Sequence, residues 1–261
     1  IEVWQDEDSG HWEEVRKVSA SSLGCVLAGL GELRSLMEQR VIAAALTRVE
    51  YGVDTGYVEA LMRRCEAALR EILPAECIQM DAGKARRYDA ALLFLIYPLN
   101  VVGERSVEEQ ILADVDQQLR GAHGIRRYPG DSYWCADYRE LLSAEQRTAD
   151  FSDSLGQRDQ LLRPGYEAQW CIFDPIVSCI RGQRYLQSGV EAEFTAQQAA
   201  LQRSLAQLTR PGGRFPAWRC PESWFYERGE WVPNDITPLL WTQGNLLQAL
   251  AGMEASLQRR L

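Results

Sequence analysis

Apolar residues recur at helical spacing along most of the chain, whereas the strict alternation typical of strands is scarce. This pattern predicts seven helices, over roughly 19–39, 55–72, 90–97, 106–119, 166–187, 191–209 and 238–259. Pro98 ends the third helix because proline cannot continue a helical hydrogen-bond ladder. Ser106 and Glu109 have the spacing of a capping box at the start of the fourth, and Pro175 predicts a kink in the fifth.

The predicted helices alternate in character. The first, third, fifth and seventh have broad apolar surfaces, whereas the second, fourth and sixth carry an apolar stripe and a charged outer face. A helix that is apolar all round must be buried, and a helix with one stripe covers another element. The alternation therefore predicts an all-α fold with two concentric layers, either an α/α toroid or a solenoid of helix pairs. The absence of a sequence repeat of fixed period favours the toroid.

In a two-layered ring, the connections from outer to inner helices all lie at one end. Here they are predicted at 10–18, 77–87, 121–165 and 210–237, and they are rich in aromatic, charged and glycine residues. Connections longer than about 12–15 residues inside a compact domain are usually functional. We therefore expect the chemistry of the protein at this end of the fold.

Charge and composition narrow the possible functions. With 46% hydrophobic residues, the 261-residue chain can build a packed core. Its net charge of −9, without a basic stripe, argues against nucleic acid as a partner, because binding phosphates requires a cationic surface. It also disfavours anionic membranes, and no apolar run approaches the roughly 20 residues of a membrane span. We therefore expect neither nucleic acid nor a membrane as partner.

The cysteines and histidines bear on location and cofactors. The seven cysteines are odd in number and include no CxxC pair, and the sequence has no Asn-x-Ser/Thr sequon. These features favour a reducing compartment, so we expect a cytoplasmic protein. Two histidines cannot by themselves form a zinc site, and there is neither a Walker loop nor a GxGxxG motif. The sequence predicts no metal and no cofactor.

Three of the connecting segments carry residues suited to sugar chemistry. The first contains Trp12, Glu13 and Glu14. The second has Arg127 followed by Tyr-Pro-Gly-Asp, and the third has Glu222 within Pro-Glu-Ser. Each has an ordinary structural interpretation when taken alone: acidic residues at a helix N-terminus, an Arg–Asp pair in a turn, and a solvated glutamate. Together they would give one cavity two carboxyl groups, an arginine and aromatic walls, which is what glycoside hydrolysis requires.

The order of these segments, followed by PLLWTQ at 238–243, resembles glycoside hydrolase family 15, the glucoamylases. The sequence RYPGDSYW at 127–134 is similar to the corresponding motif in the branch of this family that is shared with the α and β subunits of phosphorylase kinase. The resemblance extends over nearly the whole chain. It implies an (α/α)6 barrel, of which residues 1–261 would form the C-terminal part, with the N-terminal helices absent.

The resemblance also implies roles for individual residues. Glu13 matches the general acid and Glu222 the general base. Substrate-binding positions or aromatic walls of the sugar site are matched by Trp12, Glu14, Arg127, Trp170 and, as packing near the site, Trp241. Two positions depart from the family pattern: Ser223 stands where glucoamylases have Gln, and Arg126 replaces the Gly before the Arg-Tyr pair.

The implied activity is inverting hydrolysis that releases glucose from the ends of α-glucan or maltooligosaccharides. Glu13 would protonate the leaving oxygen while Glu222 activates a water on the opposite face, which requires the carboxyl groups to lie roughly 6.5–9.5 Å apart. One alternative is a non-hydrolytic glucan-binding or regulatory domain of the phosphorylase kinase type, with a possible protein partner. The other is an α-helical repeat adaptor that has no affinity for sugars.

Overall fold

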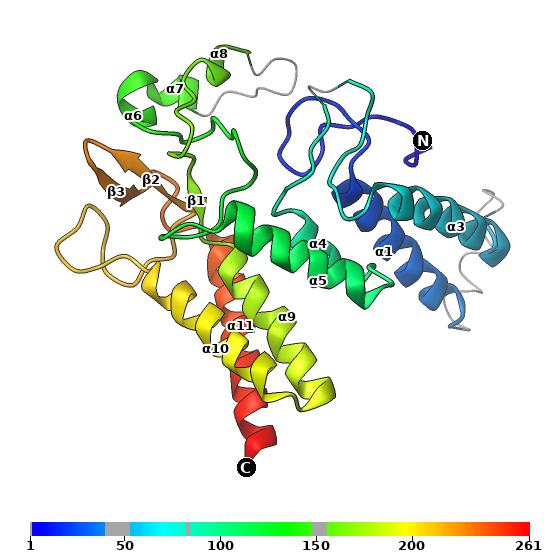
Figure 1. Cartoon of the computed structure of the whole chain (residues 1–261). Helices are drawn as coiled ribbons and strands as arrows, with labels where there is room; N and C mark the ends of the chain where they lie inside the picture. Colours follow the sequence, from blue (N-terminus) through cyan, green and yellow to red (C-terminus); the bar gives the residue numbers. More distant parts are fainter. Residues whose placement is uncertain (1, 40–52, 82–83, 148–155) are drawn as a thin grey trace.

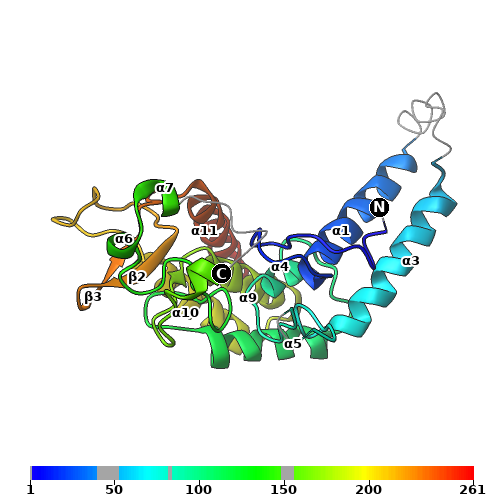
Figure 2. The same ribbon diagram turned by 90° about the horizontal axis from the view of Figure 1, so that it is seen from above.

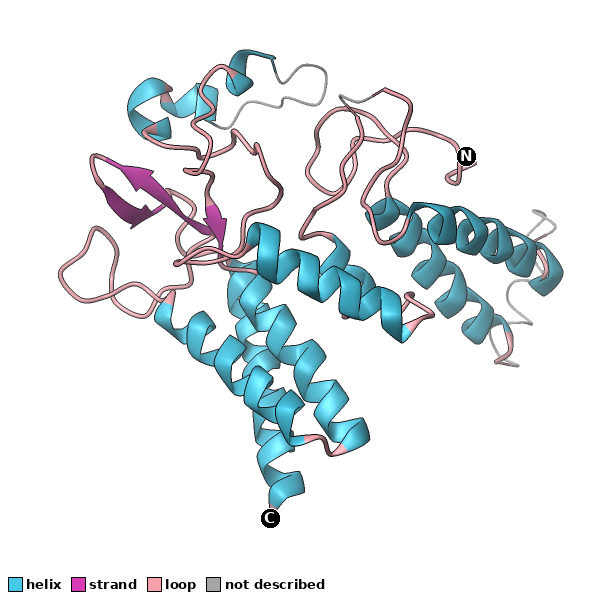
Figure 3. Cartoon of the chain, in the orientation of Figure 1, coloured by secondary structure: helices cyan, strands magenta, loops and turns pink. Residues whose placement is uncertain are grey.

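The computed structural model describes residues 2–39, 53–81, 84–147 and 156–261, and helices make up most of its regular structure (Figure 1, Figure 3). The longer helices are α1 (Ala20–Met37), α3 (Thr55–Ile72), α5 (Arg105–Asp114), α9 (Phe173–Ser188), α10 (Glu191–Ala206) and α11 (Leu240–Arg260). The shorter ones are α4 (Leu92–Ile96), the π-helix η1 (Val115–Leu119), α6 (Tyr138–Leu141), α7 (Ala144–Arg147) and α8 (Gly156–Asp159). The prediction of a mainly helical protein is confirmed.

The helices form two layers along a curved path (Figure 2). On the concave side α1, α4, α9 and α11 follow one another, each in contact with the next, and α3, α5 and α10 pack on the convex side. The buried residues follow the same division. Every residue of α4 is buried, whereas α3 buries a single stripe that includes Val58, Cys65 and Leu69. The completely apolar helix α4 therefore lies inside and the one-stripe helix α3 lies on the outside, as expected from burial.

Two helix starts differ from the sequence-based prediction. Helix α5 begins at Arg105, so Ser106 lies within its first turn and the predicted capping box is wrong. Helix α9 begins at Phe173 rather than near 166, which places Pro175 in the first turn. A proline there removes a backbone N–H that has no helical partner, so the predicted kink is also wrong.

The residues before α9 belong instead to a small sheet that the sequence analysis did not predict. In the described part of the chain, its antiparallel strands are β1 (Gln169–Trp170), β2 (Ser223–Glu227) and β3 (Glu230–Pro233). Strands β2 and β3 form a hairpin whose two turn residues, Arg228 and Gly229, both have positive φ. That geometry matches the twist of a hairpin with a two-residue loop. Because β1 pairs with the start of β2, the hairpin brings the segment after Pro221 beside the segment before α9.

The main core lies where the inner helices meet the sheet. Its largest side chains include Trp134, Phe173 and Phe225, all essentially inaccessible to solvent. A second cluster, with Phe194 and Leu246, fills the space between α9, α10 and α11. The connections at the sheet end of the inner helices therefore pack on the main hydrophobic core.

The contact between α1 and α4 depends on a glycine. A Cβ atom added at Gly24 would overlap the buried side chain of Leu95, whereas one added at Gly29 on the same helix would have no neighbour within 4 Å. We expect Gly24→Ala to destabilise the protein, because overpacking at the upper end of about 1–3 kcal/mol exceeds the gain of about 1 kcal/mol in helix propensity.

Gly29→Ala is the matched control, since it gains helix propensity without a clash. We expect it to raise the free energy of unfolding by about 1 kcal/mol. Urea unfolding of both variants checks the prediction, and equal effects at the two positions would contradict it.

Candidate functional site

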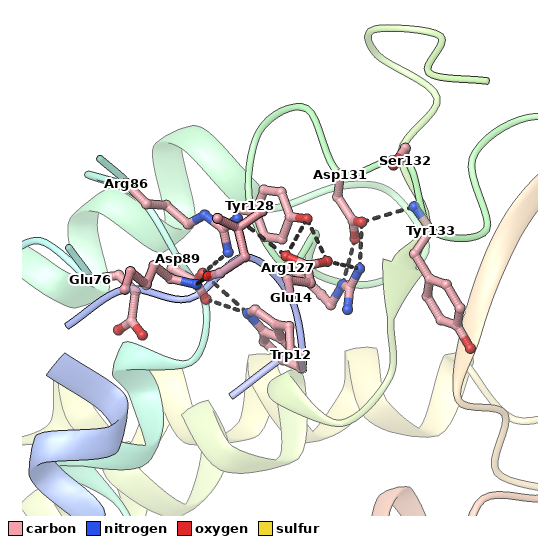
Figure 4. A network of polar contacts seen from close by, with 12 residues as sticks. Trp12, Glu14, Glu76, Arg86, Asp89, Arg127, Tyr128, Asp131, Ser132 and Tyr133 are labelled. Atoms are coloured by element: carbon pink, nitrogen blue, oxygen red, sulfur yellow. Dashed lines mark hydrogen bonds and ion pairs between the residues drawn. The ribbon is translucent and has the colours of Figure 1, made fainter. Parts of the chain in front are cut away.

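Arg127 lies at the centre of a buried polar cluster in the connection between η1 and α6. It is only 3% exposed, and its Nη2 lies 2.5 Å from Asp131 Oδ1 and 3.1 Å from Glu14 Oε1 (Figure 4). Aromatic rings surround the guanidinium group, with centroids 5.0–5.5 Å from Cζ, namely those of Trp12, Tyr128, Tyr133 and Trp170. A weakly hydrated planar cation suits such an aromatic environment.

Glu14 is the shared acidic partner of the cluster. Its carboxylate accepts hydrogen bonds from Arg86 (3.2 Å), Arg127 (3.1 Å), Arg158 (2.8 Å) and the Tyr128 hydroxyl (2.7 Å). Burial raises the pKa of Glu14, but the charges of Arg127, Arg86 and Arg158 outweigh burial and lower it to about 2. Glu14 is therefore an anion at neutral pH, and protein donors surround its two oxygens.

Trp12 is held in place through its indole nitrogen. Trp12 Nε1 donates to both carboxylate oxygens of Asp89, at 2.9 and 3.1 Å, and Arg86 pairs with the same carboxylate at 3.2 Å. The Trp12 ring lies 5.7 Å from the ring of Trp170 and 5.9 Å from that of Phe173. Trp12 and Trp170 thus form adjoining parts of one aromatic wall.

Trp241 joins this wall through His11. Trp241 stacks on Phe94 at 5.4 Å, and its ring is 5.6 Å from that of His11, which in turn lies 4.4 Å from Trp12. Burial and the charge of Arg127 lower the pKa of His11 to about 4. His11 is therefore neutral at pH 7 and acts as part of the aromatic packing.

Glu222 lies at the start of β2, next to the segment before α9. Its backbone carbonyl accepts from Cys171 N at 2.9 Å, and its carboxylate accepts from Asn234 Nδ2 at 2.6 Å. Burial raises the pKa of Glu222 to about 7, although the Asn234 hydrogen bond and the charge of Arg127 both lower it; the charge of Asp131 adds to the rise. Glu222 therefore changes its charge close to neutral pH.

Glu13 differs from its neighbours. Its side chain is exposed, whereas Trp12 and Glu14 on either side of it contact the Arg127 cluster. Its backbone is left-handed, with φ of 53°, a conformation that is uncommon for a residue other than glycine and often marks a functional segment. The loop of Glu13 and the carboxyl of Glu222 thus both lie near Arg127.

The structure brings most of the predicted site residues together, although it assigns them different environments. Trp12, Glu14, Arg127 and Trp170 are in direct contact, and Trp241 connects to them through His11. Asp131 pairs with Arg127, as the interpretation of this turn as an Arg–Asp pair predicts. Several other residues of the cluster have no individual role in the sequence-based prediction: Arg86, Asp89, Tyr128, Tyr133, Arg158 and Asn234. The motif RYPGDSYW contains two of them, whereas no sequence signal marks the other four.

No protein-family model matches the chain, and no curated protein sequence matches it. Within the described residues, no group of three or more His, Cys, Asp and Glu side chains could hold a metal ion. Nor does that part of the chain contain a helix with the length and apolarity needed to cross a bilayer.

Removal of the Glu14 charge provides a test of the cluster. We expect Glu14→Gln to lower the free energy of unfolding at pH 7 by about 3–5 kcal/mol, because buried guanidinium groups lose their shared counter-charge. The control is Glu59→Gln, which removes an exposed ion pair with Arg63 and should cost less than about 0.5 kcal/mol. Chemical denaturation of both variants measures the difference.

Acid sensitivity gives a second test of the same carboxylate. The pKa of Glu14 is lowered from 4.5 to about 2, so its contribution to stability is complete above about pH 4.5 and is lost as the pH falls towards 2. We expect the stability of the wild type to fall more steeply over this range than that of Glu14→Gln. Parallel slopes, measured by thermal unfolding at a series of pH values, would contradict the prediction.

Proposed function

We propose that the protein is a glucoamylase-like glycosidase that releases glucose from the ends of α-glucan or maltooligosaccharides with inversion. The observation that carries this proposal is the convergence on Arg127 of three segments far apart in sequence, namely 12–14, 127–133 and 222. This convergence places a buried carboxyl, an exposed glutamate and tryptophan walls at one end of the fold. Paired carboxyl groups beside the reacting sugar are what glycoside hydrolysis uses.

For the complete architecture we propose an (α/α)6 toroid, of which the described helices form one arc. The ordered contacts α1–α4–α9–α11 on the concave side and the covering helices α3, α5 and α10 support it. The site lies beside the connections that lead into the inner helices, where Trp12 precedes α1 and Trp170 precedes α9. We further propose a cytoplasmic location, in keeping with seven cysteines that are all free thiols.

In the proposed mechanism, the half-buried Trp12 binds the C–H surface of a glucose ring, and the buried Trp170 and Arg127 hold the Trp12 ring in place. Protonated Glu13 donates its proton to the glycosidic oxygen as the bond from that oxygen to the anomeric carbon breaks. Ionised Glu222 takes a proton from a water that attacks the same carbon from the opposite face. The product is glucose with inverted anomeric configuration.

Glu14 has a different role in this proposal from its neighbour Glu13. Because four protein donors already bind its carboxylate, Glu14 is suited to hold Arg127 and the Trp12 loop in place. A carboxylate saturated in this way does not need a sugar hydroxyl to satisfy it. We therefore assign Glu14 a positioning role rather than a direct contact with substrate.

A second candidate function is glucan binding without turnover, as in a regulatory domain. The pKa of Glu222 favours it, because a value of about 7 leaves the proposed base only partly ionised at neutral pH. The charge of the arginine and the aromatic rings, in contrast, do not change at any physiological pH. Such a domain would bind a glucan without cleaving it.

The decisive experiment is to incubate the protein with maltooligosaccharides and follow the release of glucose and its anomeric configuration by NMR. We expect Glu13→Gln and Glu222→Gln each to reduce kcat/KM by at least about 10²-fold, the usual contribution of a general acid or base. Glu230→Gln, an exposed change on β3, is the control and should leave the rate unchanged. Glucan binding without glucose release would favour the second candidate, and full activity in either glutamine variant would remove that residue from its role.

The pH dependence of hydrolysis tests the role of Glu222 separately. A base must be ionised, so the kcat/KM profile of the wild type should contain an ionisation near pH 7, the pKa of Glu222, that is absent from the profile of Glu222→Gln. A wild-type profile without this ionisation, or the same ionisation in Glu222→Gln, would remove Glu222 from the role of base. Both profiles are measured between pH 5 and pH 9.

A further inference from the structure

Asn234 lies next to the carboxyl of Glu222 at the end of the hairpin. Its side chain is completely buried, and its Nδ2 donates a hydrogen bond to Glu222 Oε2 at 2.6 Å. The two residues flank the β2–β3 hairpin, so the pairing of these strands brings them together. Hydrogen bonds from a donor to a charged acceptor of this length are among the stronger ones in proteins.

The backbone fixes both partners of this hydrogen bond. Asn234 N donates to Ser223 O at 3.0 Å, and Asn234 O accepts from Thr237 Oγ1 at 2.9 Å. Glu222 N in turn donates to Ile236 O at 3.0 Å. Hydrogen bonds on both sides therefore fix the backbone positions from which the amide and the carboxyl extend.

The amide acts in a defined direction on the ionisation of Glu222. An amide N–H can only donate, so the hydrogen bond stabilises the carboxylate relative to the carboxylic acid. The charged and titratable groups that act on the Glu222 carboxyl, or that it acts on, are Arg127, Asp131, Tyr133 and Cys171. Arg127 favours the anion and Asp131 opposes it.

Tyr133 and Cys171 contribute little charge of their own. Burial raises the pKa of the Tyr133 hydroxyl and that of the Cys171 thiol, so both groups stay neutral through the range in which Glu222 titrates. The ionisation of Glu222 is therefore a balance between burial and Asp131 on one side and Arg127 and Asn234 on the other.

We infer that Asn234 is the positioning residue of Glu222, holding one carboxylate oxygen and keeping the group in the ionised form that a base requires. This inference rests on the proposed function for its catalytic meaning. Asn234 acts through Glu222 and has no contact with substrate in this assignment. Its loss should therefore alter kcat and the pH profile and leave KM unchanged.

The test compares Asn234→Ala and Asn234→Leu with the wild type. Leucine is branched at Cγ like asparagine but is larger and cannot donate, so it leaves no cavity if the alanine variant fails to fold. NMR titration of 13C-labelled glutamate carboxyl groups, with the Glu222 signal assigned from Glu222→Gln, should show the Glu222 pKa raised by about one unit in either variant. The ionisation near pH 7 in the kcat/KM profile should move up by the same shift of about one unit, because that ionisation belongs to the base.

The matched control is Asn245→Ala. Asn245 is also buried and donates its amide to a backbone carbonyl, Ile172 O at 3.0 Å, so its removal disturbs packing without touching Glu222. We expect this variant to leave the Glu222 titration unchanged. Loss of activity at every pH, with no change in KM or in the titration, would identify a structural role and overturn the inference.

The NMR titration and the hydrolysis assay test this inference and the proposed function separately. If the wild type releases no glucose, the proposed hydrolysis fails, and the NMR titration still decides whether Asn234 controls the ionisation of Glu222. An unshifted Glu222 titration in a folded Asn234 variant overturns the inference even when hydrolysis is observed.

Discussion

A buried guanidinium group must be paired, and this requirement at Arg127 organises the functional end of the molecule. Removing an ion from water costs several kcal/mol even after the protein relaxes, so an unpaired Arg127 would not stay buried. Asp131 comes from the same loop, whereas Glu14 comes from the segment that leads into α1, 113 positions away. The ion pair between these two segments therefore fixes their relative position where regular secondary structure does not.

The same logic extends outward from Glu14. Arg86 reaches it from the connection before α4, and Arg158 from the short helix α8, so one carboxylate joins four segments of the chain. Arg86 also pairs with Asp89, which holds the indole of Trp12. Charge pairing in the interior thus determines the orientation of an aromatic wall, and the wall in turn is the part of the site suited to a sugar.

The long periodic helices could be predicted from the sequence, because their apolar residues recur at each turn and the pattern depends only on residues close together in the chain. The start of α9 could not be predicted, since the apolar run through Trp170 is equally suited to a helix or to a buried strand. Pairing with Ser223, far away in the sequence, makes it a strand. Arg86 and Arg158 could not be predicted for a related reason: their partner Glu14 is 72 and 144 positions away, and a single arginine carries no local signal of so distant a partner.

Three glutamates of the site differ in exposure or in pKa, and their surroundings in the fold, not the sequence motifs, determine these differences. Glu13 and Glu14 are adjacent, yet a left-handed backbone at Glu13 accompanies an exposed side chain while Glu14 is buried. Glu14 and Glu222 are both buried, but Glu14 faces three arginines, whereas Glu222 is influenced by one arginine and an opposing aspartate. Burial dominates where cations are few, so the pKa of Glu222 lies near 7 and that of Glu14 near 2.

This separation of pKa values has a functional meaning of its own. A carboxyl that never changes charge in the physiological range, as Glu14, is suited to hold a structure; one that titrates near pH 7, as Glu222, is suited to move a proton. Arg127 acts on both, since it is the direct partner of Glu14 and the distant cation of Glu222. Because Arg127 is already bound to Glu14 and Asp131, it acts on Glu222 only as a distant charge, and the hydrogen bond from Asn234 is the larger of the two influences that lower the pKa of Glu222.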